Sequence, residues 1–193
     1  MKHIFLGMLL VLFNFNLDIG AIRIGLVPTF LGYIFMHKGL VSLADVSPRF
    51  SRVLPACKGM VVFFAVVYAL NLFGLSPLLP APRSPALALI VPLFTATIVP
   101  LYIHRGMIQG IKDIESTREQ NLGSGNLSTV WWLLLATSFA VFSLSLHTAL
   151  ATVGIVAALS VCHFVLSVCH LFLFYKTQQL FHEEPTPPPA DAE

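Results

Sequence analysis

Apolar residues in this chain gather in long runs that short polar connections separate. The runs cover about residues 3–21, 25–43, 56–75, 86–104, 127–146 and 149–175. A helix needs roughly 17–25 apolar residues to cross a bilayer, and these runs approach or exceed that length. The runs are continuous rather than alternating, and backbone groups in lipid must pair internally. The pattern therefore predicts an all-α transmembrane helix bundle with about six membrane segments.

The first two segments are less regular than the other four. Only about ten apolar residues follow Lys2 before polar side chains appear, which is short for a helix that crosses a bilayer. No cleavage site with small residues follows this run, so we expect a retained segment rather than a cleaved signal peptide. We favour six crossings, and the alternative is four crossings with a re-entrant pair formed by segments 3–21 and 25–43.

A short polar stretch between these two segments contains Asn14, Asn16, Asp18 and Arg23. An ionisable residue inside a membrane segment costs free energy, so it is by default a functional hypothesis. We interpret the stretch first as a turn in the outer headgroup layer. Two alternatives stay open. One is a structural Asp18–Arg23 pair, and the other is a candidate polar or ion site in which the Asn14 and Asn16 carbonyl oxygens assist Asp18.

Three glycines recur every seven residues in the second segment, at Gly25, Gly32 and Gly39. This spacing places them on one stripe of the helix predicted over residues 25–43. A glycine stripe lets the backbone of a neighbouring helix come close and is typical of helix packing in membranes. We therefore predict that another helix packs on this stripe, in preference to a ligand groove.

Residues 104–120 have the pattern of an amphipathic cytoplasmic helix. Ile103, Met107, Ile111 and Ile114 form an apolar stripe on one face of this helix. Polar and charged residues cover the rest of its surface. Such a helix either extends segment 86–104 out of the membrane or lies on the membrane surface. His104 and Arg105 are expected to contact anionic lipid headgroups. The acidic, proline-rich tail over residues 183–193 is expected to be disordered.

Composition and charge narrow the class further. Of 193 residues, 56% are hydrophobic and 10% are charged, whereas a soluble domain has about 25% charged residues. A net charge of +2 gives no support for nucleic-acid binding. With a cytoplasmic N-terminus, all of the Lys and Arg residues except Arg23 and Arg83 fall on the cytoplasmic side. We therefore expect a membrane protein with both termini in the cytoplasm.

The histidines are the weak candidates for metal or haem binding. His163 and His170 are seven residues apart, which places them on one helical face but about 10 Å from each other. That distance is too long for one tetrahedral zinc ion, and a haem would need a ligand from another helix, such as His147 or His37. We favour neutral imidazoles that hydrogen-bond to neighbouring helices, and we expect no cofactor.

Catalytic signatures are missing from the sequence. There is no Gly-x-Ser-x-Gly motif, no phosphate-binding loop and no dinucleotide-binding fingerprint. Ser143 and Ser145 lie near His147 but have no acidic partner in the sequence around them. An enzyme is therefore disfavoured, although the sequence does not exclude one.

The N-terminal third contains Ile24-Gly-Leu-Val-Pro-Thr-Phe-Leu-Gly-Tyr33, then Lys38-Gly-Leu40, then Ser47-Pro-Arg-Phe50. This stretch resembles a group of small multi-pass integral membrane proteins of bacteria that is common in Firmicutes. Relatives often carry Asp where this chain has Thr29, so an acidic site shared at that position is in doubt. The resemblance implies a bacterial plasma (inner) membrane and carries no activity.

Three functional hypotheses follow from the sequence. The favoured one is a non-catalytic membrane protein that binds membrane lipids, a protein partner or a second copy of itself. The first alternative is a small-solute or ion transporter or channel that uses Asp18, Arg23 and the helices kinked by Pro92 and Pro100. The second alternative is a haem- or metal-binding membrane protein.

Overall fold

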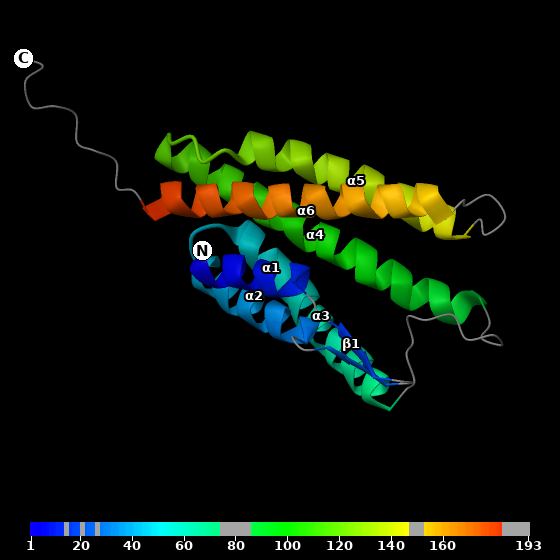
Figure 1. Ribbon diagram of the computed structural model, residues 1–193. Coiled ribbons are helices and arrows are strands. Elements are labelled where there is room, and N and C mark those ends of the chain that lie inside the picture. Colours follow the sequence, from blue (N-terminus) through cyan, green and yellow to red (C-terminus); the bar gives the residue numbers. More distant parts are fainter. Residues whose placement is uncertain (14–15, 20–21, 26–27, 74–85, 147–152, 183–193) are drawn as a thin grey trace, which may run out of the picture.

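The computed structural model describes residues 1–13, 16–19, 22–25, 28–73, 86–146 and 153–182 (Figure 1). Apart from one β-hairpin, the described chain is helical. Its elements are α1 (Lys2–Leu12), β1 (Asn16–Ile19), β2 (Ile22–Gly25), α2 (Thr29–Leu43), α3 (Pro48–Leu72), α4 (Ala86–Arg118), α5 (Ser124–Leu146) and α6 (Val153–His182). Asn14, His147 and the tail 183–193 lie outside the described residues.

Four helices are long and apolar enough to cross a membrane: α3, α4, α5 and α6. The predicted count of about six crossing segments is not confirmed, because α1 has 11 residues and α2 has 15. Helices of these lengths extend over only about 16 and 22 Å, against roughly 30 Å for the hydrocarbon core.

The predicted boundaries of the first two segments were wrong. The helix that begins at Lys2 ends at Leu12 instead of continuing to residue 21. Residues 16–19 and 22–25 pair as an antiparallel hairpin, so Gly25 belongs to a strand and α2 begins only at Thr29. The sequence of these strands alternates polar and apolar residues, which is the period of a strand rather than of a helix.

Glycines allow the backbones of α1 and α2 to pack at very short range. A Cβ atom built on Gly7 would lie 2.5 Å from the carbonyl oxygen of Gly32, and one built on Gly39 would lie 2.8 Å from the backbone nitrogen of Ile4. No side chain larger than hydrogen fits at these positions without moving a backbone. Gly32 and Gly39 thus face α1, whereas Gly25, the third member of the predicted stripe, does not belong to this helix.

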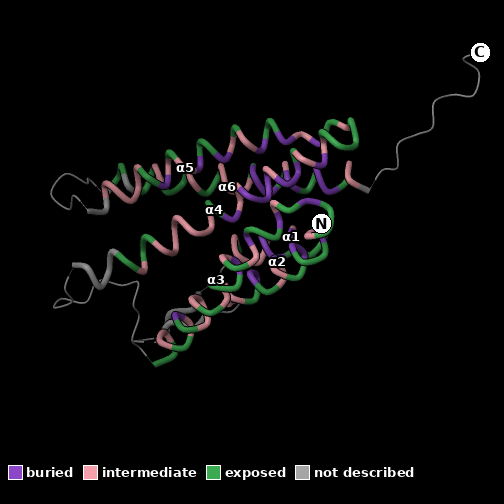
Figure 2. Tube along the Cα trace, turned by 180° about the vertical axis from the view of Figure 1, so that it is seen from behind, coloured by how far each residue is buried: buried purple, intermediate pink, exposed green. Residues whose placement is uncertain are grey.

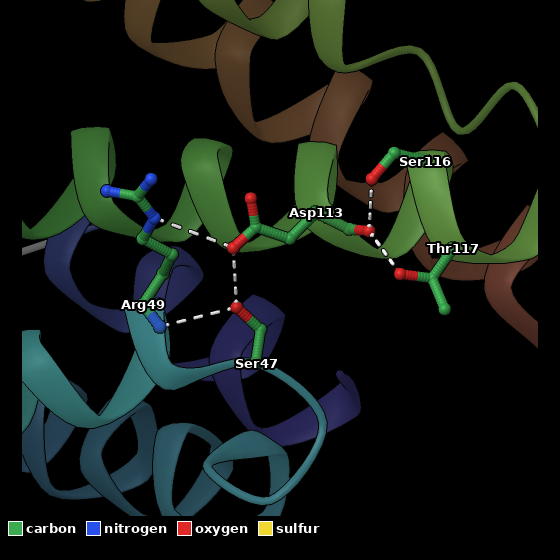
Figure 3. Close-up of polar contacts among 5 residues, drawn as sticks. All are labelled: Ser47, Arg49, Asp113, Ser116 and Thr117. Atoms are coloured by element: carbon green, nitrogen blue, oxygen red, sulfur yellow. Dashed lines mark hydrogen bonds and ion pairs between the residues drawn. The ribbon is translucent and has the colours of Figure 1, made fainter.

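Helix α3 begins at Pro48, eight residues before the predicted segment 56–75, and Ser47 is its N-terminal capping residue. The Ser47 hydroxyl accepts a hydrogen bond from the Arg49 backbone N–H at 3.3 Å and donates one to Asp113 on α4 at 2.9 Å (Figure 3). The Arg49 guanidinium lies 3.5 Å from the same Asp113 carboxylate. Because both charged side chains are about two-fifths exposed, this ion pair adds little stability. Its main effect is to fix the start of α3 against α4.

Helix α4 is continuous from the apolar segment into the amphipathic stretch. The apolar stripe predicted there is buried, with exposed fractions of 3% or less at all four positions. This stripe packs against the protein core and not against the membrane surface, and Phe50 and Val53 of α3 belong to the same core. Buried positions gather where α1, α2, α4 and α6 meet, whereas residues 91–100 of α4 are half-buried or exposed (Figure 2).

The six helices close into a ring. Each helix contacts the next one in the chain, and α1 contacts α6. Side chains also join the elements near the α4–α5 connection, where the Trp131 indole N–H donates to the Leu101 carbonyl at 2.9 Å and Thr177 donates to the Leu122 carbonyl at 2.8 Å. A ring of this kind leaves an interior that side chains must fill, and that interior contains the candidate site.

Candidate functional site

Two histidines meet in the interior of the ring. His104 of α4 and His170 of α6 lie with their rings stacked, 5.1 Å between centroids and 10° between planes. His170 is only 2% exposed. Sequence reasoning missed this pair, because His104 was expected at the headgroups together with its neighbour Arg105. Instead, the guanidinium of Arg105 lies over the rings of Trp131 and Trp132.

Residue spacing in the sequence indicates that His104 is buried, but the polar residues around it obscured this pattern. His104 follows Leu101 by three residues and precedes Ile108 by four, so all three lie on one face of α4. Leu101 and Ile108 are both buried. The adjacent Arg105 and the polar character of residues 104–120 made the whole stretch look exposed.

A cavity of about 290 Å³ lies beside the histidine pair. Its wall contains residues of α1, α2, α4, α5 and α6, so five of the six helices that form the bundle contribute. The residues are Met8, Val11, Leu12, Tyr33, Met36, Pro100, His104, Leu134, Ser160, His163, Phe164, Ser167, His170 and Leu171. None of the described residues in this wall is an acid, a lysine or an arginine.

Two further cavities of about 200 Å³ each continue the first one toward the N-terminal half of α4. One shares Pro100, His104 and Ser167 with the first cavity and adds Thr97 and Ser138; the other reaches Leu93 and Phe142. His163 lines all three cavities. The cavities therefore form a series along α4 and α6, with His104 at one end, Leu93 and Phe142 at the other, and His163 in the wall of each.

Local sequence explains why polar groups face this interior. His163, Ser167 and His170 follow one another at spacings of four and three, so they lie on the same face of α6. The Ser167 hydroxyl donates to the His163 carbonyl at 2.8 Å, and His163 Nδ1 lies 3.2 Å from the Thr137 hydroxyl of α5. Pro100 has no N–H to donate to the carbonyl of Ala96, which lines the neighbouring cavity.

One polar atom in this wall has no partner. Among the described residues, Nε2 of His170 is buried and makes no hydrogen bond. Leaving such a group unpaired costs about 1–3 kcal/mol, and an unpaired buried polar atom needs a physical explanation. This nitrogen has almost no accessible surface, so it does not itself face the open space of the cavity.

Three residues of the predicted polar stretch, Asn16, Asp18 and Arg23, belong to the β1–β2 hairpin. Asp18 and Arg23 are direct partners in the register of the β1–β2 hairpin, and Asn16 pairs with Gly25. His37 is not among the described residues that line these cavities. Within the described part of the chain, no group of three or more His, Cys, Asp or Glu residues is arranged to hold a metal ion.

Comparison of the chain with models of protein families, with curated proteins and with solved structures gives no match. Function must therefore be argued from the cavity itself. Its chemistry is that of a ligand site in general: a mostly apolar wall with a few polar groups that converge.

Proposed function

We propose that this protein is a non-catalytic integral membrane protein that binds an uncharged, amphipathic small molecule of the lipid class. The observation that carries the proposal is the cavity of about 290 Å³, whose described lining residues are mostly apolar and include His163 and His170 but no charged side chain. An ionic headgroup would be desolvated there without a counter-charge, which is costly. An apolar molecule with one or two polar oxygens suits the wall better.

Access to the cavity supports a ligand that comes from the bilayer. Ser160 and Phe164 of α6 line the cavity and are exposed on the surface of this apolar helix, Phe164 by 50%. Helix α6 is one of the four helices that are apolar enough to cross a membrane. A ligand dissolved in lipid would therefore meet the cavity at the side of the helix bundle, without passing through water.

Filling the cavity should remove the ligand. We expect Ser167→Phe to lower the amount of lipid-class molecule that co-purifies with the protein at least tenfold, because the new ring occupies the space between His163 and His170. Native mass spectrometry of the purified protein measures this amount. The matched control is Cys162→Phe, which adds the same ring on an exposed position of α6 outside the described cavity walls. Equal ligand retention by both variants would contradict the proposal.

We further propose a bacterial plasma-membrane location with both termini in the cytoplasm and the β1–β2 hairpin at the outer interface. The distribution of Lys and Arg supports this orientation. The lengths of α2 and of the hairpin strands support the depth at which the hairpin is placed in the bilayer. Phe30 of α2 packs on Tyr68 near the end of α3, and Tyr33 stacks on Phe64. From Lys38 to Thr29, α2 descends about 14 Å, and a four-residue strand adds about 13 Å. The sum approaches the roughly 30 Å of the hydrocarbon core.

Cysteine labelling tests this depth. In a variant without the three native cysteines, Ile22→Cys should react with a membrane-impermeant maleimide added to intact cells. Ser116→Cys, which lies on the exposed polar end of α4, should react only after the cells are opened. A re-entrant pair whose hairpin stays inside the membrane predicts the opposite for Ile22→Cys, namely no reaction in intact cells.

A further inference from the structure

Arg105 lies where α4 passes from its apolar half into its polar half. It is the first charged residue of this helix, and α5 beside it contains no charged residue. Trp131 and Trp132 of α5 lie near the same level, because the Trp131 indole N–H donates to the carbonyl of Leu101, one turn before Arg105. Tryptophan and basic residues at the end of an apolar run are typical of the boundary between hydrocarbon and headgroups. This level of the bundle therefore fits the headgroup layer of a bilayer.

The guanidinium of Arg105 is held on an aromatic surface. Its central carbon lies 4.9 Å from the centre of the Trp131 ring and 5.7 Å from that of the Trp132 ring. Its Nη1 donates to the Ser128 hydroxyl of α5 at 3.3 Å. Trp131 is only 8% exposed, so the surface beneath the guanidinium is fixed by packing. The cation is thus oriented before a ligand arrives, which lowers the entropy that binding costs.

Most of the hydrogen-bonding capacity of this guanidinium is not used by the described part of the chain. A guanidinium has five N–H donors, and the one hydrogen bond from Arg105 among the described residues goes to Ser128. No acidic side chain in that part of the chain forms an ion pair with Arg105. The Asp113 carboxylate lies next to Arg49, and the Glu115 carboxylate accepts two hydrogen bonds at the start of α5. A phosphate suits the remaining donors, because its oxygens match the planar fork of a guanidinium.

The surroundings of Arg105 favour a phosphate that belongs to a lipid over one dissolved in water. Tyr102 of α4 and both Trp132 and Leu133 of α5 are 49–56% exposed, on two helices that are apolar enough to cross a membrane. Acyl chains gain free energy by covering such a surface, and a free phosphate does not. Lys112 is exposed and lies two turns further along the same face of α4. This second positive charge favours a lipid with net negative charge over a zwitterionic one.

We propose that Arg105, on its surface of Trp131 and Trp132, binds the phosphodiester of an anionic phospholipid at the outer face of α4 and α5. The guanidinium N–H groups donate to the phosphate oxygens, and the acyl chains lie along Trp132 and Leu133. Arg105 is not among the residues that line the three cavities. The site is therefore separate from that of the proposed ligand, and the two are tested independently.

Quenching of tryptophan fluorescence by brominated phospholipids tests this site. The chain has two tryptophans, and both contact Arg105. The protein is reconstituted in mixed bilayers of phosphatidylcholine and phosphatidylglycerol, with bromine near the ester end of the acyl chains in one of the two lipids at a time. We expect phosphatidylglycerol to bind about fivefold more strongly than phosphatidylcholine, the gain typical of one basic residue at an anionic membrane surface. Equal quenching by the two lipids at equal mole fraction would overturn the proposal.

Substitution separates the site from the overall positive charge of the protein. Arg105→Gln should remove the preference for phosphatidylglycerol, whereas Arg52→Gln, at an exposed position of α3, should leave it unchanged. An equal loss in both variants would show attraction by overall charge and would overturn the assigned site.

The unaltered protein distinguishes a lipid phosphate from a free one, whether or not Arg105→Gln folds. Millimolar inorganic phosphate should change the quenching by brominated phosphatidylglycerol no more than sodium chloride of the same ionic strength does. A loss of the preference in inorganic phosphate alone would show that the site takes free phosphate and would overturn the lipid assignment.

Discussion

Replacing Gly7 by alanine should destabilise the protein by about 1–3 kcal/mol, the usual cost of overpacking a tight interior. The added Cβ would lie 2.5 Å from the Gly32 carbonyl oxygen and 2.7 Å from the Met36 backbone nitrogen. Both are backbone atoms of α2, so no side-chain rotation relieves the contact. The two helices must separate, and α1 and α2 both contribute to the wall of the cavity. The same variant should therefore also retain less ligand.

Cys57 offers a direct measurement of this destabilisation. It is fully buried, and its thiol donates to the Tyr33 carbonyl of α2 at 3.4 Å. In a background that lacks the exposed Cys162 and Cys169, a thiol-reactive dye reports when α2 leaves α3 on heating. Gly7→Ala should lower the midpoint by several degrees. Gly59→Ala is the control, since a Cβ at this exposed helical position meets nothing within 4 Å. A midpoint for Gly7→Ala equal to that control would refute the packing account.

The second large effect is expected at Phe50, whose substitution by alanine should cost about 3–5 kcal/mol. Phe50 is 1% exposed and belongs to the core between α3 and α4. Its loss leaves a cavity next to the amphipathic half of α4. Phe73→Ala serves as the control, because this ring is 80% exposed and its removal should change stability by less than about 0.5 kcal/mol.

A double substitution measures whether Gly110 and Phe50 are in contact. A Cβ on Gly110 of α4 would lie 2.5–2.8 Å from three carbons of the Phe50 ring. Gly110→Ala alone should therefore destabilise the protein. In the Phe50→Ala background the ring is gone, so Gly110→Ala should become neutral or stabilising, because alanine favours a helix over glycine. The coupling between the two substitutions should exceed about 0.5 kcal/mol in thermal unfolding, and simple additivity would show that the two side chains do not meet.

The long helices could be predicted because their signals are local. Continuous apolar runs define α3 to α6, although α3 begins at Pro48, ahead of the apolar run itself. The amphipathic stripe of α4 was also readable, because helical spacing alone identifies its four members. The residues against which the stripe packs could not be predicted, because Phe50 and Val53 belong to a helix about fifty residues earlier in the chain.

The hairpin and the histidine pair could not be predicted for different reasons. The strands alternate polar and apolar residues over only four positions each, and the apolar context made a helix look better than a strand. The stacking of His104 on His170 depends on how α4 meets α6, which is a property of the closed ring. Spacing within one helix linked His163 to His170, but nothing local in the sequence linked either residue to α4.

The most direct test of the central claim is an experimental structure of the protein in lipid nanodiscs. We expect continuous density of an elongated molecule in the cavity beside His104 and His170, extending toward Leu93. A cavity that is collapsed, or that contains only separate water molecules, would contradict the claim that this bundle binds a lipid-class ligand.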